Sequence, residues 1–580
     1  MSEKYKIFPD GLYFCTLTVV GWSRHFGSPF CESASSNSIL KINSMKKINT
    51  SLILILLVNL VQAQNPLLKK WDHRFGGNAT DFIFSLQPTA DAGFILGGQS
   101  QSQISGDKTE PQWGGWDYWI VKTDTDGVKQ WDRDFGGNQY DYLYCVKQTT
   151  DGGYILGGAT ESDSSGNKTS HFWGGSDYWI IKTDSQGIKQ WEKDFGGTSN
   201  DVLYSLQQTL DGGYILGGTS YSGISGNKTV PNWDATLSTE DYWVIKTDSL
   251  GNVQWQKNFG GTDTDILKYL QQTVDGGYIL GGTSLSNISG DKTQDVWTQS
   301  GSDYWILKIN SLGIKQWDKD FGGNDYDFFS SLQQTSDHGY ILAGYSGSGI
   351  GGDKTQASWG INDYWIVKTD SLGNKQWEKD FGGTGNDDEL GIVLQTTDGG
   401  YLIPGTSDSP LSGDKSENNL GLEQGWVVKT NSSGTKLWDI TMQSPGNNEE
   451  CFISKANDGC YAIAISDNGS IGGFNTQASW NISHDYWIIK FCDSTATTSI
   501  NQITNSQLQF SIYPNPSNTT LNISINNKEN ILITNLLGEI VLQKNFSSTT
   551  KGKVELDISF LSVGIYFIKA GNEVRKFVKE

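Results

Sequence analysis

The chain has little of several residue types, and each scarcity excludes a class of protein. Among its 580 residues are 3 Met, 5 His and 6 Cys, and 43 Lys and Arg stand against 64 Asp and Glu, a net charge of −21. Nucleic-acid binding needs clustered positive charge, so we expect no nucleic-acid partner. No C-x-x-C pair occurs, so neither a zinc knuckle nor a dithiol redox motif is indicated. The His residues do not cluster in the sequence, which weakens zinc and nucleophilic mechanisms.

Glycine and aromatic residues are abundant instead. The chain holds 70 Gly, 22 Trp, 24 Tyr and 24 Phe, and 36% of it is hydrophobic. This composition is typical of β-strands and tight turns, and it supplies enough apolar material for a core. At roughly 150 residues per domain the length suggests about four domains, although all-β folds often run longer as one unit.

One apolar stretch, Leu52 to Leu60, follows Lys46 and Lys47 and precedes the small-residue site Val61-Gln62-Ala63. A positive region, a short apolar region and such a site are typical of a signal peptide. The stretch is too short to cross a bilayer comfortably, so we expect no transmembrane anchor. The prediction is a signal peptide over 45–63, cleaved between Ala63 and Gln64, with a buried strand as the alternative.

The residues before this segment resemble part of another family. Residues 1–22, MSEKYKIFPDGLYFCTLTVVGW, resemble the N-terminus of the IS200-like transposases. The metal-binding His-x-His pair of that family does not occur in the chain, so no transposase activity is implied. We expect residues 1–44 to be an upstream remnant or a misannotated start, with Met45 as the working initiator.

An internal repeat dominates the rest of the sequence. One Trp, usually followed by Phe-Gly-Gly, recurs at Trp71, Trp131, Trp191, Trp255, Trp317, Trp377 and Trp438. A second, mostly in Asp-Tyr-Trp, recurs at Trp119, Trp179, Trp243, Trp305, Trp365, Trp426 and Trp487. Both series have spacings of 60 to 64 residues, and seven copies are present.

Each copy predicts four short strands. In the second copy they are 141–149, 152–160, 177–184 and 188–195, bounded by Gly, Asn, Asp or Ser. Four antiparallel strands per repeat are typical of a β-propeller blade. No sustained 3.6-residue period occurs, which excludes a helical solenoid, and a parallel β-helix would need shorter rungs.

The phase of the repeat predicts how the array ends. The first strand, KKWDHRFGG, precedes any complete copy, and the last copy ends at 485–491 without a Trp strand after it. This first strand would therefore complete the last blade, with strands near 450–456, 459–466 and 485–491. The prediction is an all-β chain with a seven-bladed β-propeller over 64–492, closed by its N-terminal strand.

One hairpin of the repeat, with Asp124, Gly127 and Trp131, resembles the tryptophan-docking hairpin of quinoprotein propellers. The spacing is one residue shorter than in that family. The resemblance implies a packing role only.

The C-terminal segment differs in composition. A Ser/Thr-rich linker (493–507) leads into 508–580, where alternating strands and turns predict a small Ig-like β-sandwich. The segment contains a motif set that includes Pro514, Asn515, Pro516, Gly538, Gly564 and Tyr566. On these residues it closely resembles the type A C-terminal sorting domain of the Bacteroidota type IX secretion system. The resemblance implies the secretion machinery as a partner and an extracellular or outer-surface location.

An aspartate follows most Gly-Gly-x-x-x segments and is the first candidate site. In a propeller these carboxylates would open the innermost strands and ring one mouth of the channel, where calcium could bind. The alternative is that each Asp caps its own loop by accepting backbone hydrogen bonds. The residues are Asp81, Asp141, Asp201, Asp265, Asp327 and Asp387, with Glu450 as the nearest counterpart in the seventh copy.

The long loops between the second and third strands are the other candidate. Several contain Ser-Gly-Asp/Asn-Lys-Thr, and six carry an additional Trp. Flat rings beside hydrogen-bonding groups suit saccharides, whereas the alternative is that each Trp folds back to cover a blade edge. The residues are Trp113, Trp173, Trp233, Trp297, Trp359 and Trp480.

These patterns predict an exported, non-catalytic binding or scaffolding module for a glycan or a surface protein. The alternatives are an exported polysaccharide-active or quinoprotein-like enzyme and a purely structural surface component. An enzyme should break the repeat symmetry with a unique set of side chains on one face. A disulfide between Cys451 and Cys460, which flank a tight turn, is a further possibility.

Overall fold

The structure of the protein is a computed structural model that describes residues 67–298, 301–388, 391–493, 510–513, 517–525, 531–535, 540–544, 552–570 and 573–580. The predicted signal peptide (45–63), the cleavage site at Ala63 and Gln64, and the segment 1–44 lie outside these residues, as does most of the linker. They stay predictions.

Seven antiparallel sheets, numbered in chain order, occupy the described residues between 67 and 493. Sheet 1 has β2 (Asp81–Pro88), β3 (Phe94–Ser100), β4 (Asp117–Thr123) and β5 (Lys129–Phe135). Sheet 2 has β6 (Asp141–Gln148), β7 (Tyr154–Thr160), β8 (Asp177–Thr183) and β9 (Lys189–Phe195). Sheet 3 has β10 (Asp201–Gln208), β11 (Tyr214–Ser220), β12 (Asp241–Thr247) and β13 (Val253–Phe259). Sheet 4 has β14 (Asp265–Gln272), β15 (Tyr278–Ser284), β16 (Asp303–Ile309) and β17 (Lys315–Phe321).

The last three sheets follow the same order with two differences. Sheet 5 has β18 (Asp327–Gln334), β19 (Tyr340–Ser346), β20 (Asp363–Thr369) and β21 (Lys375–Phe381). In sheet 6 the first strand is split, giving β22 (Asp387–Asp388), β23 (Leu394–Gln395), β24 (Tyr401–Ser407), β25 (Gln424–Thr430) and β26 (Lys436–Met442). Sheet 7 has β27 (Asn448–Lys455), β28 (Tyr461–Asp467), β29 (Asp485–Asp493) and, from the start of the chain, β1 (Leu67–Phe75). One 3-10 turn, η1 (Trp480–Ile482), precedes β29.

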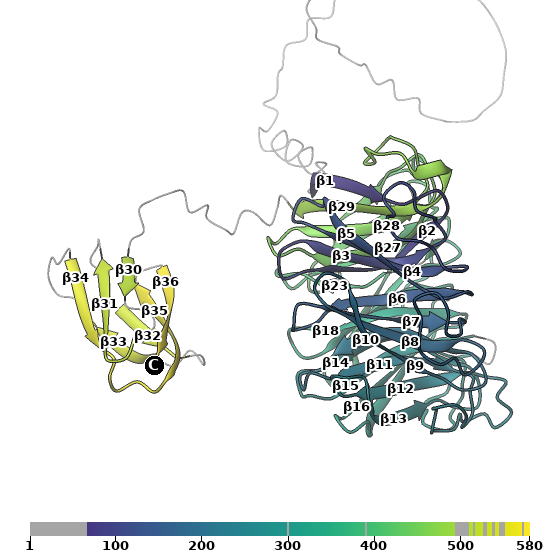
Figure 1. Ribbon diagram of the computed structural model, residues 1–580, viewed down its shortest axis with the longest axis horizontal. Helices are drawn as coiled ribbons and strands as arrows, with labels where there is room; N and C mark the ends of the chain where they lie inside the picture. The colour runs from purple at the N-terminus through teal and green to yellow at the C-terminus, as the bar shows by residue number, and fades with distance from the viewer. Residues whose placement is uncertain are drawn as a thin grey trace, which may run out of the picture. The chain divides into compact units, whose positions relative to one another are not determined.

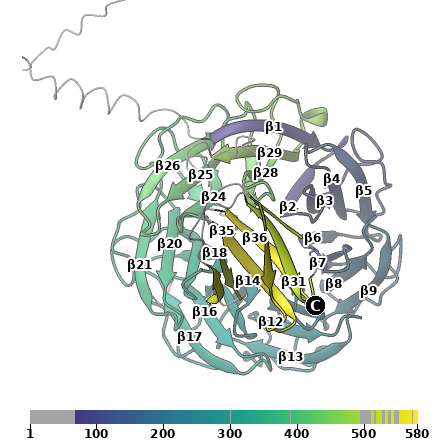
Figure 2. The ribbon, with the colours of Figure 1, turned by 90° about the vertical axis from the view of Figure 1, so that its left-hand side faces the viewer.

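The predicted strands of the second copy are confirmed as β6 to β9. Figure 1 shows the sheets side by side, and Figure 2 shows them following one another around a common centre, with the fourth strands at the outside. No sheet of the described residues closes on itself into a barrel.

The N-terminal strand belongs to the last sheet. β1 pairs antiparallel with β29, so that Arg74 lies opposite Trp487 and Phe75 opposite Tyr486. This confirms the predicted pairing of the first strand with 485–491. Sheets 7 and 1 also share a core in which Ala462 and Ile488 pack with Phe94 of sheet 1.

Neighbouring sheets are joined by a tyrosine that reaches from one into the next. Tyr178 of sheet 2 donates its hydroxyl proton to the carbonyl of Trp243 in sheet 3, at 3.0 Å. The ring passes over Gly218, where a Cβ would lie 2.8 Å from the tyrosine hydroxyl and 1.9 Å from a backbone carbonyl. A residue without a side chain is therefore required there. The other pairs are Tyr118–Trp179, Tyr242–Trp305, Tyr304–Trp365, Tyr364–Trp426 and, from sheet 7 to sheet 1, Tyr486–Trp119.

The junction of sheets 6 and 7 reverses this arrangement. Gly425 of sheet 6 occupies the position that is tyrosine at the other junctions. Ile465 of sheet 7 occupies the position that is glycine at the other junctions. A Cβ on Gly425 would lie 2.7 Å from the Ile465 side chain. The large and the small residue have exchanged sheets, so the space between the sheets stays filled.

The tryptophans of the fourth strands dock on the following sheet. A Cβ on Gly127, in the β4–β5 turn, would lie 2.6 Å from the ring of Trp71, and Gly127 also has a φ of 79° that favours glycine. Trp131 packs in the same way against Gly187. The hairpin therefore has the packing role that its resemblance implied, with the ring supplied by the preceding sheet.

The disulfide differs from the expected one. Cys460 bonds to Cys492, not to Cys451. Tyr461 pairs with Phe491 in the β28–β29 ladder, so the next residues outward, Cys460 and Cys492, lie opposite each other. Cys451 is a free thiol buried in the core shared with sheet 6.

The C-terminal segment forms two small antiparallel sheets over one core. The first has β30 (Phe510–Tyr513), β31 (Thr520–Ile525) and β34 (Gly552–Asp557). The second has β33 (Ile540–Lys544), β32 (Ile531–Thr534), β35 (Gly564–Ala570) and β36 (Glu573–Lys579). Leu521 and Leu556 of the first pack with Ile533, Ile568 and Phe577 of the second.

The tyrosine contact gives a first testable prediction. Tyr178→Phe should lower the free energy of unfolding by about 1 kcal/mol, because it leaves the Trp243 carbonyl without this donor. Gly425→Tyr should lower it further, since the ring would overlap Ile465. Adding Ile465→Gly should recover much of that loss by recreating the pair of the other junctions. Thermal unfolding of the mature chain measures these changes, and no recovery in the double variant would contradict the packing argument.

Candidate functional site

Most of the loop tryptophans lie against the loop of the next sheet. Trp233 donates its indole N–H to Asp291 Oδ2 at 2.8 Å, and its ring covers Gly290. This geometry supports the covering role over a shared binding site, because each ring serves its own pair of sheets. The corresponding pairs are Trp297–Asp353, Trp359–Asp414 and Trp480–Asp107.

Trp113 and Trp173 differ because an asparagine replaces the aspartate acceptor. Asn167 uses its side chain on the backbone instead, accepting from Gly136 N at 3.0 Å and donating to Asp134 O at 2.8 Å. Trp113 still covers Gly166, whereas Trp173 packs edge-on against His171 at 4.5 Å. The six side chains remain 37% to 58% exposed, and the structure does not gather them into one site.

The aspartate that begins the first strand of a sheet caps the turn before that strand, a place that we call the corner. Asp141 Oδ2 accepts hydrogen bonds from Gly137 N at 2.8 Å and from Ser162 Oγ at 2.9 Å. Asp81, Asp201, Asp265, Asp327 and Asp387 make the same two contacts and are fully buried. Within the described ranges no group of three or more His, Cys, Asp or Glu is placed to hold a metal ion. These contacts favour the capping role over a calcium ring.

The seventh counterpart of these aspartates is Asn448, not Glu450. Asn448 pairs with the last residue of β28, Asp467, as Asp81 pairs with the last residue of β3. Glu450 lies two residues further on, at an irregularity of the ladder, with a φ of 48°. It accepts a hydrogen bond from Ser466 Oγ at 2.8 Å.

A second buried aspartate opens the third strand of sheets 1 to 5 and 7. The Asp485 carboxylate accepts a hydrogen bond from the backbone N–H of Trp480 at 2.7 Å. The backbone carbonyl of the preceding residue, His484, accepts one from the backbone N–H of Asp81 in the next sheet at 2.8 Å. Two carboxylates therefore lie close together at the corner. Burial, and then the charge of Asp81, raise the pKa of Asp485 to about 8. Burial raises the pKa of Asp81 to about 6.

The same pairing recurs around the repeat. Burial, and then the charges of Asp194 and Asp201, raise the pKa of Asp177 to about 8. Burial and the charge of Asp265 raise the pKa of Asp241 to about 7. At the junction of sheets 6 and 7 both positions are amides, Gln424 and Asn448.

The lysine of the Ser-Gly-Asp/Asn-Lys loop is buried against the fourth strand. Lys108 Nζ forms an ion pair with Asp134 and donates to Ser100 Oγ at 3.1 Å. Lys168–Asp194, Lys292–Asp320 and Lys354–Asp380 are equivalent ion pairs. These lysines were not singled out from the sequence, although their recurrence in six of the seven loops was a signal for them.

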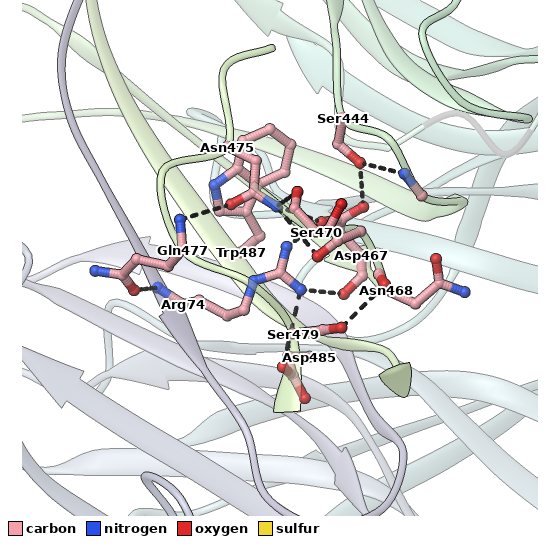
Figure 3. Close-up of polar contacts among 12 residues, drawn as sticks. Arg74, Ser444, Asp467, Asn468, Ser470, Asn475, Gln477, Ser479, Asp485 and Trp487 are labelled. Carbon is pink, nitrogen blue, oxygen red and sulfur yellow. Dashed lines mark hydrogen bonds and ion pairs between the residues drawn. The ribbon is translucent and has the colours of Figure 1, made fainter. Parts of the chain in front are cut away.

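Sheet 7 carries the reverse arrangement of charge (Figure 3). Arg74 occupies the position of Asp134, Asn475 that of Lys108, and Asp467 that of Ser100. The Arg74 guanidinium donates to the Asp467 carbonyl at 2.6 Å and forms an ion pair with the Asp467 carboxylate.

The same network is completed from β29 and the loop before it. Asp485 lies 3.8 Å from Arg74, Asn475 donates to Asp467 at 3.1 Å, and Gln477 accepts the backbone N–H of Arg74 at 2.9 Å. In any other sheet Arg74 would face a buried lysine. Since an unpaired buried charge is costly, this network assigns β1 to sheet 7.

Of the sorting-domain residues, Gly564 and Tyr566 lie in β35, and Pro514, Asn515, Pro516 and Gly538 lie outside the described residues. Tyr566 stacks on Phe577 with ring centroids 5.6 Å apart and donates to Ser562 O at 2.9 Å. Its role is to complete the core of this segment.

The carboxylate pairs predict a pH dependence. The pKa values of Asp485 and Asp81 are higher in the folded chain than in the unfolded chain. The contribution of these two groups to the free energy of unfolding is therefore fully present below about pH 4 and is lost as the pH rises toward 8. Asp485→Asn, which imitates Gln424, should flatten this decline. Thermal unfolding between pH 4 and pH 8 measures it, with the exposed Asp126→Asn as control. An equal slope in Asp485→Asn and the control would contradict the prediction.

The charge reversal predicts a compensating set of variants. Arg74→Asp should lower the free energy of unfolding by about 3–5 kcal/mol, because it leaves the buried Asp467 carboxylate without its cation. Adding Asp467→Ser and Asn475→Lys recreates the Lys108–Asp134–Ser100 set and should recover most of the loss. Limited proteolysis at β1 and thermal unfolding measure both. A triple variant no more stable than Arg74→Asp would show that the network does not place β1.

Comparison with known proteins places the C-terminal segment in a family. Residues 511–580 match the secretion system C-terminal sorting domain. The segment therefore directs export to the cell surface or the extracellular space, with the secretion machinery as a partner. Within the described residues, no helix has the length and apolar character needed to span a membrane. No curated protein sequence matches the chain.

Several solved structures resemble the chain at low identity. One is a protein of unknown function from Dyadobacter fermentans, with 9% identity, a TM-score of 0.40, and coverage of 74% of this chain and 99% of that one. Another is PorZ, a surface component of the type IX secretion system of Porphyromonas gingivalis, with 11% identity, a TM-score of 0.38, and coverage of 87% and 60%. A third is the Pan2 WD40 domain of Neurospora crassa, with 10% identity, a TM-score of 0.39, and coverage of 73% and 95%. The fold is defined here by strand pairing and not by these likenesses.

Proposed function

We propose that residues 64–492 form a seven-bladed β-propeller closed by its N-terminal strand, acting as a non-catalytic binding or scaffolding module at the cell surface. Its partner is a glycan or a surface protein. The observation that carries the architecture is the pairing of β1 with β29. The contacts of sheet 7 with sheet 1, through Tyr486 and Trp119, support closure because they repeat those between consecutive sheets.

The remaining parts of the chain serve export in this proposal. The signal peptide (45–63) is removed before Gln64, and residues 1–44 are not part of the working protein. The sorting domain (508–580), reached through the linker (493–507), is removed as the protein is released or attached at the surface of a Bacteroidota cell. The family match of 511–580 supports this part.

The contacts of the reactive side chains support a binding role over an enzyme. The recurring loop lysines bond within their own sheets, as Lys108 does with Asp134, and the loop aspartates bond to the tryptophan of the preceding sheet, as Asp291 does with Trp233. The His residues make separate contacts: His73 bonds to Asp126 O at 2.9 Å, and His484 lies 3.6 Å from Glu449. A polysaccharide-active or quinoprotein-like enzyme would need such groups to converge at one exposed place.

The proposal is tested with the chain that remains after signal-peptide removal, Gln64–Glu580, called the mature chain in these tests although it keeps the sorting domain, on an array of immobilised glycans and on outer-membrane surface proteins. The expected result is saturable binding without turnover of the bound glycan. Product release would favour the enzyme, and no saturable ligand would favour a purely structural component. Weaker binding by Trp113→Ala or Trp359→Ala would support the exposed aromatic rings as the contact, and unchanged binding in both would refute it.

A further inference from the structure

The junction of sheets 6 and 7 departs from the other junctions at three coupled pairs of positions. Each pair replaces a contact that all or most of the other junctions repeat, and in each case both partners have changed. Tyrosine and glycine become Gly425 and Ile465, the carboxylate pair becomes Gln424 and Asn448, and the loop Trp and its Asp acceptor become Leu420 and Phe474.

These changes are not required by the way the chain ends meet. Sheets 7 and 1 hold the two ends of the repeat region, yet that junction keeps the usual contacts, including the bond of Tyr486 to Trp119 and that of Trp480 to Asp107. The departure belongs to a junction inside the continuous chain. The pairing of the two chain ends therefore does not explain the changes at the junction of sheets 6 and 7.

A cavity of about 600 Å³ opens at this same junction. Its walls come from the β24–β25 loop and from the connection between β26 and β27. The volume lies in the range of small-molecule sites, roughly 300–1,000 Å³. The principal lining residues are Asp408, Asn418, Asn419, Leu422, Glu423 and Asn447, and the last two immediately precede the amide pair Gln424 and Asn448.

The asparagines of the cavity have hydrogen-bonding capacity to spare. Asn419 donates its amide to Ser407 O at 2.8 Å and to Leu422 O at 2.7 Å, while its Oδ1 is buried without a partner. Asn418 accepts the N–H of Leu411 at 2.8 Å with its Oδ1, which leaves the amide hydrogens as donors. The Asn418 side chain is exposed, so its amide hydrogens can reach a ligand hydroxyl, whereas Asn419 holds the cavity wall through its bonds to Ser407 O and Leu422 O.

The lining selects the class of ligand. Amides and carboxylates match hydroxyl groups, which both donate and accept, and Leu422 and Pro410 offer apolar contact to the carbon face of a sugar ring. The eight lining residues include two acids, Asp408 and Glu423, and no base. An acidic saccharide would be repelled by this charge.

We propose that the cavity at the junction of sheets 6 and 7 is the site where this protein binds a neutral saccharide. The assignment rests on the proposed binding function and makes it specific. It also separates the site from the loop tryptophans, since the β24–β25 loop has Leu420 where the others have Trp.

The test compares matched variants of the mature chain. An array of immobilised neutral and uronic-acid oligosaccharides selects the strongest binder, and isothermal titration then gives its Kd. Asn419→Ala and Asn418→Ala should each weaken binding at least tenfold. The control is Gln112→Ala, because Gln112 holds the equivalent position in sheet 1 and also bonds to its own loop, at Gly115 O. Asp408→Asn should admit uronic-acid oligosaccharides that the unmodified chain excludes.

The outcomes separate this assignment from the proposed function. Loss of affinity in both asparagine variants but not in Gln112→Ala, with unchanged thermal unfolding, supports the site. Binding that is unchanged in both variants overturns the site and leaves the binding function standing. Preference for acidic saccharides by the unmodified chain overturns the neutral class. If the unmodified chain binds no oligosaccharide, the assignment is overturned, and surface-protein binding alone then decides the proposed function.

Discussion

The distance between neighbouring sheets is the constraint on which the rest of this structure depends. A tyrosine such as Tyr178 reaches the Trp243 carbonyl only if the two sheets approach across Gly218. Both polar groups are buried, so a wider spacing would leave them unpaired at a cost of about 1–3 kcal/mol. The docked tryptophans and the loop tryptophans also bond or pack across this spacing. Each therefore presupposes it.

Where one of these contacts changes, its partner changes with it. Gly425 faces Ile465, so volume lost on one sheet is regained on the other. Arg74 lies where the other sheets have Asp, Asn or Thr, and its partners have changed with it, to Asp467 in place of Ser or Thr and Asn475 in place of Lys. Close-packed interiors tolerate such exchanges because volume and charge are conserved together. The two exchanges have different consequences: the second identifies the strand that joins the chain ends, whereas the first sits beside a cavity.

The strands and the pairing of β1 could be predicted because the Trp spacing and the order of motifs report them directly. The disulfide and the seventh corner residue could not. The Phe-Gly-Gly that precedes the other first-strand aspartates is replaced by Met442-Gln443-Ser444, and Asn448 carries an amide in place of a carboxylate, so no local signal marks Asn448 as the seventh residue. Cys451 points into a core that the spacing of cysteines does not reveal. The direction of a buried charge pair, as between Lys108 and Asp134, depends on tertiary contacts that no local pattern carries.

The repetition of the sheets limits where a ligand can bind. Residues copied into most sheets serve the junctions, as Trp233 does by bonding to Asp291, and such a side chain gives up that bond if it turns to a ligand. Ligand binding therefore loses the fewest contacts at a junction where the repeated contact has been replaced and other side chains fill the space between the sheets. In the described residues the junction of sheets 6 and 7 meets both conditions, because Ile465 fills the core while the exposed Asn418 presents its amide hydrogens at the cavity. Loss of symmetry, more than exposure of aromatic rings, marks the place where this protein differs from a purely structural component.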